Sequence, residues 1–358
     1  RITNFSVNTA NETKDALISL MQNGASNVII DLRDNPGGLL SSSLDLLDLI
    51  LPKNLELVST KGRAGKSIKN YKTLNNALIP DTINMAVLIN GASASASEIV
   101  AGVLQDYDRA IVLGSQSFGK GLVQTVIGIN QETALKITNS KYYIPSGRSL
   151  QKREFIDDEL IANSSAVADT LFQTKAGRTV IGGGGIGPDV IVKDEGSYPL
   201  AASILRSRGY FKFVQENNNQ YSSIDEVLAD EELMVKFKTL FEKNDISGYV
   251  DGQEDLKLAK EKLSKKEEKN LFINNAFSVI EKQIEKTQSA MFEDEKEIIQ
   301  RMVHGEFAFY YNGYEGRYNI YLKDDTVVQK AIEIFADESQ YLSILSNTES
   351  TEVASLNN

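Results

Sequence analysis

Three serines alternate with small residues in the stretch GASASASEIVAG, residues 91–102, just before an amphipathic run. Ser95 and Glu98 have the spacing of a capping box, in which a serine caps a helix and a glutamate reaches back. The small neighbours would also let a substrate backbone come close. The first N–H groups of the predicted helix would lie beside the Ser95 hydroxyl, and such groups stabilise an oxyanion. We therefore interpret Ser95 as a candidate nucleophile, although the G-x-S-x-G spacing of a nucleophile elbow is absent.

A serine nucleophile needs a base, and the sequence offers few. The chain has no cysteine and one histidine, His304, which lies next to a glycine and is expected to be a surface or C-cap residue. A lysine can serve if burial lowers its pKa enough to leave it neutral. The candidate is Lys120 in GSQSFGKGLVQ, which glycines flank on both sides. An ordinary lysine in a glycine turn is the alternative reading of this motif by itself.

The elements that would position these residues alternate between strands and helices over residues 1–193. Apolar, β-branched runs predict buried strands, and apolar residues at helical spacing predict helices. The predicted strands are 27–32, 85–89 and 110–113, with a hairpin of 123–129 and 134–138, and the predicted helices are 8–21, 40–51 and 98–105. A loop carrying Lys61, Arg63 and Lys66 is expected after the second helix. This order predicts parallel strands joined by helices, with the serines at the edge where such sheets bind ligands.

The character of the chain changes at about residue 194. The region 224–241 is amphipathic and helical, and Lys and Glu at helical spacing over 255–303 predict solvated helix faces. The tyrosine-dense stretch 308–321 predicts either a hairpin or an aromatic cluster between helices. A last helix is expected at 327–335, followed by a loose polar tail from about 346. We therefore expect a core over residues 1–193 and a mainly helical domain over residues 194–358.

Composition narrows the class of protein. The 358 residues are enough for two domains, and the apolar share of 41% is that of a soluble globular protein. The net charge of −11, without a basic face, argues against nucleic-acid binding. No apolar run is long enough for a membrane span, and no signal peptide is visible. The chain opens on Arg1 in what reads as mid-domain sequence, so we expect a processed or trimmed product.

The two motifs together resemble the carboxyl-terminal processing peptidases, also called tail-specific proteases. These are serine peptidases with a Ser-Lys dyad on a fold akin to the Clp protease and crotonase group. In that family the nucleophile is the serine of S-A-S-E and the base is the lysine of G-K-G, 25 residues on. Ser95 and Lys120 match both positions, and Gln124 matches a glutamine four residues after the lysine. The resemblance implies an α/β, Clp protease/crotonase-like core with a mainly α-helical C-terminal domain.

Further segments match the family. DLRDNPGG, residues 31–38, resembles a glycine motif that donates an oxyanion-hole N–H, which we assign to Gly38 with Gly37 as the fallback. The backbone of Ala96 would be the second donor. KYYIPSGRSLQ, residues 141–151, resembles the strand and loop that line the substrate cleft. GGGGIGPDV, residues 182–190, resembles a closing Gly-Ile-x-Pro-Asp segment. The resemblance covers roughly residues 1–193 and fades in the helical half.

One feature of the family is missing from this chain. Family members usually carry a PDZ domain just before the catalytic core, and PDZ modules read a C-terminus by β-augmentation and carboxylate capture. The opening RITNFS resembles the strand that follows that domain. We therefore expect either that the PDZ domain was removed from this chain or that this member lacks it, and substrate selection and gating are open questions.

The resemblance implies a serine endopeptidase that cleaves protein or peptide substrates near their C-termini, with neither metal nor cofactor. Ser93 and Ser97 are expected to be structural, Glu98 to cap its helix, and Arg33 and Asp34 to brace the glycine turn. Family members work mostly in the bacterial periplasm, at the envelope or in the plastid lumen, and the resemblance therefore implies an exported protein of the bacterial periplasm or cell envelope. The helical half offers surface for a homodimer, but the sequence does not establish one.

Two rivals remain. A non-catalytic binding scaffold on the same fold would be favoured if Lys120 were solvated with an ordinary pKa. A crotonase-like acyl-CoA enzyme would share the fold and an oxyanion hole, although such an enzyme does not need a Ser-Lys pair.

Overall fold

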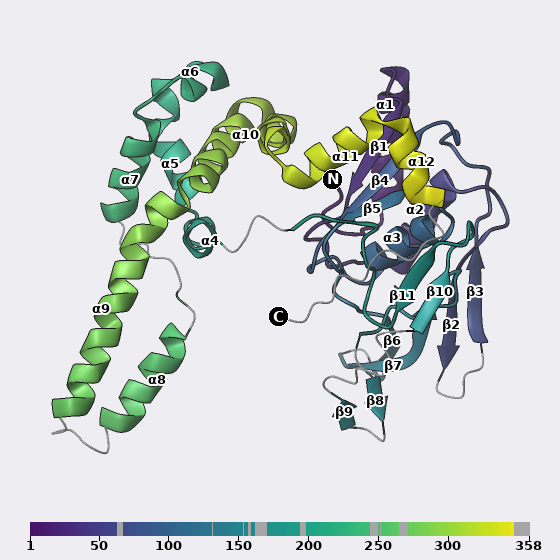
Figure 1. Ribbon diagram of the computed structural model, residues 1–358, viewed down its shortest axis with the longest axis horizontal. Helices are drawn as coiled ribbons and strands as arrows, with labels where there is room; N and C mark the ends of the chain where they lie inside the picture. Colours follow the sequence, from purple (N-terminus) through teal and green to yellow (C-terminus); the bar gives the residue numbers. More distant parts are fainter. Residues whose placement is uncertain are drawn as a thin grey trace. The chain divides into compact units, whose positions relative to one another are not determined.

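The chain forms two units, which we describe separately (Figure 1). One unit combines Arg1–Asp194 with the residues from Thr326 onward, and the other comprises Glu195–Asp325. The computed structural model describes residues 1–62, 67–130, 132–152, 154–156, 159–161, 170–193, 198–243, 250, 252–264 and 271–346.

A parallel four-stranded sheet forms the centre of the first unit. Its order is β1 (Asn27–Asp31), β4 (Asn84–Ile89), β5 (Ile111–Gly114) and β12 (Val190–Ile191). The predicted strands at 27–32, 85–89 and 110–113 are confirmed to within a residue at each end. The strand β4 is buried almost throughout, as expected for a parallel strand covered on both faces.

Helices cover both faces of this sheet. Met85, Val87 and Ile89 belong to one core, shared with α1 (Thr9–Gln22), α2 (Leu40–Ile50) and α3 (Ala96–Asp106). The alternate β4 residues Ala86 and Leu88 belong to a second core, shared with α11 (Thr326–Ala336) and α12 (Glu338–Ser346). The result is a three-layer α/β/α arrangement, which agrees with the predicted fold class of an α/β core.

The last two helices belong to a different unit from the one that the sequence predicted. The predicted helical domain was to run from 194 to 358, whereas α11 and α12 pack on the sheet of the first unit. The apolar side chains Val327, Val328, Ala331 and Ile334 recur on one face of α11, and the sheet buries that face. The helix predicted at 327–335 is confirmed, α12 was not predicted, and the tail beyond residue 346 lies outside the described residues.

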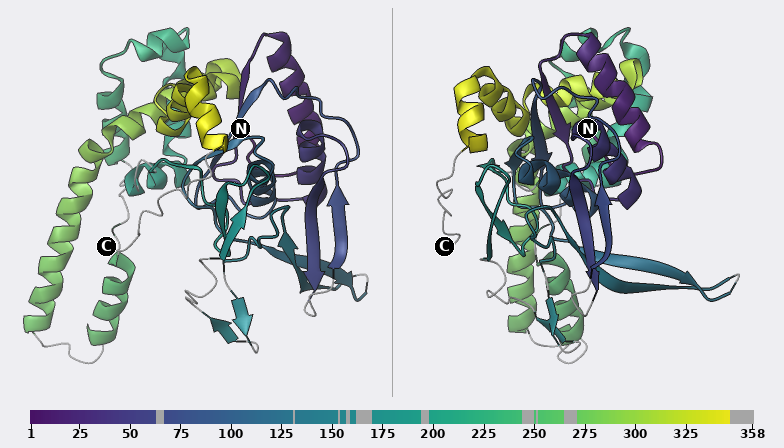
Figure 2. Two further views of the ribbon diagram at one scale, coloured as in Figure 1. Left: turned by 45° about the vertical axis from the view of Figure 1, so that its right-hand side comes forward. Right: turned by 90° about the vertical axis from the view of Figure 1, so that its right-hand side faces the viewer.

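A second sheet is antiparallel, with the order β3 (Ser67–Lys72), β2 (Glu56–Gly62), β7 (Ala134–Tyr143) and β6 (Leu122–Gly128). The predicted hairpin is confirmed as β6 and β7, which extend from the rest of the unit (Figure 2). The predicted loop is wrong for Lys61, which lies in β2 opposite Lys141 and stacks on the Tyr143 ring. Arg63 and Lys66 lie outside the described residues.

Two small antiparallel pairs complete the unit: β8 (Glu154–Ile156) with β9 (Glu159–Ile161), and β10 (Thr170–Gln173) with β11 (Thr179–Gly182).

The second unit is helical in its described part. Its elements are α4 (Pro199–Arg206), α5 (Gly209–Asn217), the 3₁₀ turn η1 (Asn218–Gln220), α6 (Ile224–Leu228), α7 (Leu233–Lys243), α8 (Gln253–Ser264), α9 (Leu271–Asp294) and α10 (Lys296–Lys323). The helix predicted at 224–241 is therefore two helices. The break occurs because the Asp230 carboxylate accepts the N–H of Glu232 and the Lys236 ammonium, which starts a new helix.

The tyrosine-dense stretch lies in α10 and forms an aromatic cluster, one of the two alternatives predicted for it. Gly313 has a φ of 63° and kinks the helix. Beyond the kink, Arg317 lies over the Phe309 ring and pairs with Glu306. His304 also lies inside α10, so its expected place at a helix C-terminus is wrong. Within the described residues, no helix has both the length and the hydropathy required to cross a membrane.

Candidate active site

Three segments meet at one edge of the central sheet. They are the glycine turn (residues 33–38) after β1, the serine turn (residues 90–95) after β4, and the lysine loop (residues 115–121) after β5. Because β1, β4 and β5 are adjacent and parallel, the segments that follow them emerge side by side. The sheet order thus brings together motifs that are far apart in the sequence.

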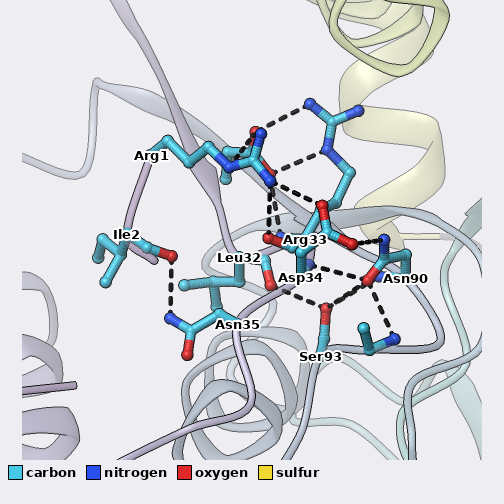
Figure 3. A network of polar contacts seen from close by, with 10 residues as sticks. Arg1, Ile2, Leu32, Arg33, Asp34, Asn35, Asn90 and Ser93 are labelled. Carbon is cyan, nitrogen blue, oxygen red and sulfur yellow. Dashed lines mark hydrogen bonds and ion pairs between the residues drawn. The ribbon is translucent and has the colours of Figure 1, made fainter. Parts of the chain in front are cut away.

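Hydrogen bonds join the glycine turn to the serine turn (Figure 3). The Ser93 hydroxyl donates to the Leu32 carbonyl at 2.8 Å, and the Asp34 N–H donates to Asn90 Oδ1 at 3.0 Å. The Asn90 side chain in turn donates to the Asp34 carboxylate at 2.9 Å. Arg33 makes a bidentate pair with Asp31, with its Nε at 2.9 Å and Nη2 at 2.8 Å. These contacts agree with the bracing that we expected of Arg33 and Asp34.

Asn35 shapes the glycine turn from inside. It is fully buried, its side-chain oxygen accepts the Gly37 N–H at 2.9 Å, and its amide donates to the Ile2 carbonyl at 2.9 Å. Its own carbonyl accepts the Ala94 N–H at 3.0 Å and the Ser97 hydroxyl at 2.9 Å. Sequence reasoning missed this residue, although an asparagine two residues before a glycine is a signal for an Asx turn.

Gly38 lies where only glycine fits. It pairs with Phe5 in a parallel bridge, and a Cβ on Gly38 would collide with the Phe5 carbonyl. In that bridge Phe5 bonds to the residues on either side of Gly38, so the N–H of Gly38 points away from Phe5. Among the described groups this N–H has no acceptor, whereas the N–H of Gly37 is engaged by Asn35.

The three serines have different surroundings. Ser93 and Ser97 are fully buried with their hydroxyls bonded to backbone carbonyls, as expected of structural residues. Ser95 is half-buried and precedes the first residue of α3, with a φ of 56° and a ψ of −111°. A positive φ is strained for a residue with a side chain, and such strain clusters at active sites. The predicted capping box is present, because the Ser95 N–H donates to the Glu98 carboxylate at 2.8 Å.

Lys120 is close to Ser95 through its backbone but not through its side chain. Its N–H donates at 2.8 Å to Glu98 Oε2, the oxygen that accepts the Ser95 N–H. The two peptide nitrogens are therefore no further apart than twice that distance. The Lys120 side chain is exposed, so the burial expected of a neutral lysine base is absent. Within the described part of the chain, no hydrogen bond joins its ammonium to the Ser95 hydroxyl.

Gln124 and Ala96 complete the set of predicted residues. Gln124 lies on β6 with an exposed side chain that makes no hydrogen bond to Lys120 or to any other described residue. Ala96 is the first residue of α3 and is buried. A Cβ on Gly37 would lie 3.0 Å from the Ala96 nitrogen and 2.8 Å from Ser95 Cβ. The glycine turn therefore packs directly against the serine and the start of the helix.

The segment 141–151 supports the lysine loop. Gln151 accepts the Gly121 N–H at 2.9 Å, and the Lys152 N–H donates to the Gly119 carbonyl at 3.0 Å. Arg148 does not face a cleft: it is buried and pairs with the equally buried Asp106 at 2.9 Å, at the end of α3. Burial raises the pKa of the Asp106 carboxyl, which Arg148 partly offsets. This ion pair attaches the segment to α3.

The chemistry of the site is therefore that of a hydroxyl beside a helix N-terminus. Two backbone N–H groups without an acceptor among the described residues, those of Gly38 and Ala96, lie on either side of the serine turn. In the part of the chain that the structure describes, no group of three or more acidic or histidine side chains is arranged to hold a metal ion. The arrangement suits acyl transfer from a carbonyl compound to a serine.

Comparison with known proteins agrees with this class of site. The family model described as peptidase family S41 matches residues 1–161, and a model described as "Probable PDZ-protease, C-terminal helical domain" matches residues 200–335. A carboxy-terminal-processing protease of Bartonella bacilliformis is 50% identical over 123 residues, which are 34% of this chain and 28% of that protein. A carboxyl-terminal-processing protease of Synechocystis is 38% identical over 161 residues, 45% of this chain and 37% of that protein.

A solved structure is also similar. The photosystem II D1 C-terminal processing protease is 25% identical, with a TM-score of 0.43, over 55% of this chain and 42% of that chain.

Residues 1–161 therefore match a family of serine-type peptidases, and the curated relatives of this segment are named carboxyl-terminal processing proteases. The matched segment spans about a third of the length of the curated relatives.

Proposed function

We propose that this protein is a serine endopeptidase that hydrolyses peptide bonds near the C-termini of protein substrates, with Ser95 as nucleophile and Lys120 as general base. One observation carries the proposal. Ser95 is the member of the serine cluster that is not fully buried, and its strained backbone lies at the N-terminus of α3 against the glycine turn. The names of the curated relatives, which are carboxyl-terminal processing proteases, support the substrate class.

The proposed reaction is acyl transfer in two halves. Neutral Lys120 removes the proton from the Ser95 hydroxyl as Oγ attacks the substrate carbonyl carbon. The N–H groups of Gly38 and Ala96 donate to the oxyanion, and losing one such donor costs about 10²–10³ in rate. Lys120 then gives its proton to the leaving amine as the peptide bond breaks. Lys120 next removes a proton from water, which attacks the acyl-enzyme carbonyl, and it returns this proton to Ser95 Oγ as the ester bond breaks, which releases the acid product and free Ser95.

The reaction requires the Lys120 side chain to turn inward. Its four-carbon stem is flexible, and its backbone N–H already shares an acceptor oxygen with that of Ser95. We propose that a change of side-chain rotamer brings the amine to the hydroxyl. In this state Gln124 would orient the lysine as the third group of a triad.

The non-catalytic scaffold is the second candidate, and the exposure of Lys120 is the observation that favours it. The family match and the geometry of Ser95 favour the peptidase. We also infer from the resemblance that the protein is exported to the bacterial periplasm or cell envelope. A homodimer through the helical unit is a further proposal, which analytical ultracentrifugation would test.

Casein cleavage tests the proposed activity. The wild-type chain should cleave this unstructured protein, and Ser95→Ala and Lys120→Ala should be inactive while retaining the circular dichroism spectrum and melting temperature of the wild type. Equal cleavage by all three would mean that Ser95 is not the nucleophile. A folded wild type that neither cleaves casein nor reacts with serine-directed reagents would favour the scaffold.

A further inference from the structure

Glu98 holds the serine turn and the lysine loop together, and we propose that it is the positioning residue for both members of the dyad. The inference rests on the proposed function, since it concerns the roles of Ser95 and Lys120. From the sequence this glutamate was expected only to cap α3. Its contacts reach beyond that helix.

The Glu98 carboxylate accepts four hydrogen bonds, one from the serine turn and three from the lysine loop. Oε2 accepts the backbone N–H of Ser95 at 2.8 Å and that of Lys120 at 2.8 Å. Oε1 accepts the N–H of Gly119 at 2.7 Å and the hydroxyl of Ser117 at 2.5 Å. The residue is fully buried, so these bonds replace solvation of the carboxylate.

The network extends to the closing glycine segment. The Ser117 hydroxyl accepts the N–H of Ile186 at 2.7 Å while it donates to Glu98, and the Ser117 N–H donates to the Ile186 carbonyl at 3.0 Å. Gly185 packs against the same group, because a Cβ there would lie 3.0 Å from Glu98 Oε1 and 2.6 Å from the Ser117 hydroxyl. The glycine at this position therefore leaves room for the carboxylate and its donors.

Only an ionised carboxylate can accept all four bonds. An ionised glutamate has two acceptor oxygens and no donor, whereas a glutamine has one acceptor oxygen and an NH₂ group. In Glu98→Gln the NH₂ group would face N–H or O–H donors at one of the two positions. Burial raises the pKa of the Glu98 carboxyl above its ordinary value, and the four hydrogen bonds offset this rise only in part. The four donors around Glu98 are therefore matched to a carboxylate and not to an amide.

Few other contacts fix the lysine loop to the serine turn. The Phe118 N–H donates to the Ser93 carbonyl at 3.0 Å, which is a direct backbone bond between the two segments. Without Glu98, the Lys120 N–H would lose the acceptor that it shares with the Ser95 N–H. A displacement of about 1 Å between reacting groups costs about 10² in rate.

The test compares Glu98→Gln with a matched control. Glu295 is also a buried glutamate whose carboxylate accepts two backbone N–H groups, those of Leu200 and Ala201, but it lies in the helical unit. We expect Glu98→Gln to lower kcat about 10²-fold with little change in KM, and to slow the reaction of Ser95 with a fluorophosphonate by a similar factor. Glu295→Gln should lower the melting temperature and leave both rates unchanged.

Each outcome decides a separate point. If folded Glu98→Gln reacts and turns over at the wild-type rate, Glu98 does not position the dyad. If both variants lose rate only in proportion to their loss of folded protein, Glu98 is merely structural. If Glu98→Gln does not fold, Ser117→Ala removes one donor and keeps the carboxylate, and it should lower kcat without raising KM. If the wild type itself fails to react at Ser95, the proposed function fails, and this inference fails with it.

Discussion

Burial and hydrogen bonding distinguish three serines that are alike in sequence. Ser93 and Ser97 are fully buried, and their hydroxyls donate to the carbonyls of Leu32 and Asn35. Ser95 lies between them, half-buried, with a strained backbone. The outer two therefore fix the shape of the turn that presents the central one.

Ser93→Ala should therefore affect stability rather than chemistry. The substitution removes the donor to the Leu32 carbonyl and the acceptor of the Asn90 N–H, and both groups remain buried or partly buried. Leaving such a group unsatisfied costs about 1–3 kcal/mol. Urea unfolding should show this loss in the free energy of unfolding, while folded protein still reacts at Ser95. Lost reactivity with unchanged stability would point to Ser93 as the nucleophile.

The sequence predicted which residues form the candidate site, but it did not predict how exposed their side chains are or what they contact. The spacing of Ser95, Lys120 and Gln124 follows directly from the motifs. The exposure of Lys120 was not predictable, because a lysine in a glycine turn can point either way. The bonds from Glu98 to Gly119 and Lys120 were not predictable either, because they depend on the order of strands β4 and β5 in the sheet.

At the scale of elements, α10 contains the one histidine of the chain. His304 is half-buried, and its pKa is lowered from the ordinary value of 6.5 because burial disfavours the charged ring. Between the lowered pKa and 6.5, the unfolded chain binds more protons than the folded chain. Stability therefore falls as the pH falls through this window.

His304→Gln should remove this part of the pH dependence. We expect the urea midpoint of the wild type to drop between about pH 7.5 and about pH 5.5 by more than that of the variant. Unfolding followed by circular dichroism at the two pH values measures both drops. An equal drop in the two proteins would show that His304 titrates normally in the folded state.

Elements with a strong apolar pattern were predictable, and elements that depend on partners were not. The buried strands β1, β4 and β5 are short apolar runs, and the structure has them where expected. Lys61 in β2 is polar and is held in a strand by its pairing with β7, which no local pattern reveals. The break between α6 and α7 depends on the side-chain bonds of Asp230, which oppose the continuous apolar pattern.

At the scale of the molecule, the chain returns to its first unit after the helical one. Tyr341 in α12 donates its hydroxyl to the Met85 carbonyl at 3.2 Å and accepts the Met85 N–H at 3.0 Å. Those groups belong to the central strand β4. The composition predicted the division near residue 194. It did not predict that α11 and α12 pack on the first unit, because the pattern of an amphipathic helix does not specify which unit it covers.

Tyr341→Phe tests this packing. Loss of the hydroxyl leaves a buried N–H and a carbonyl of β4 without these partners, at a cost of about 1–3 kcal/mol. The melting transition of the α/β unit should therefore move to lower temperature, although the substituted residue lies 256 positions along the chain. As a control, Tyr314→Phe changes an exposed tyrosine of the helical unit and should have little effect. Equal melting of Tyr341→Phe and the wild type would contradict the packing of α12 on the sheet.

The most direct test of the account is to find which residue reacts with a fluorophosphonate. Wild-type protein, Lys120→Ala and Ser93→Ala would each be treated with the reagent, digested and analysed by peptide mass spectrometry. If Ser95 and Lys120 form the dyad, the wild type and Ser93→Ala carry the phosphonyl group on Ser95, and Lys120→Ala reacts far more slowly. Modification at another serine, or equal rates with and without Lys120, would contradict the proposed Ser-Lys dyad.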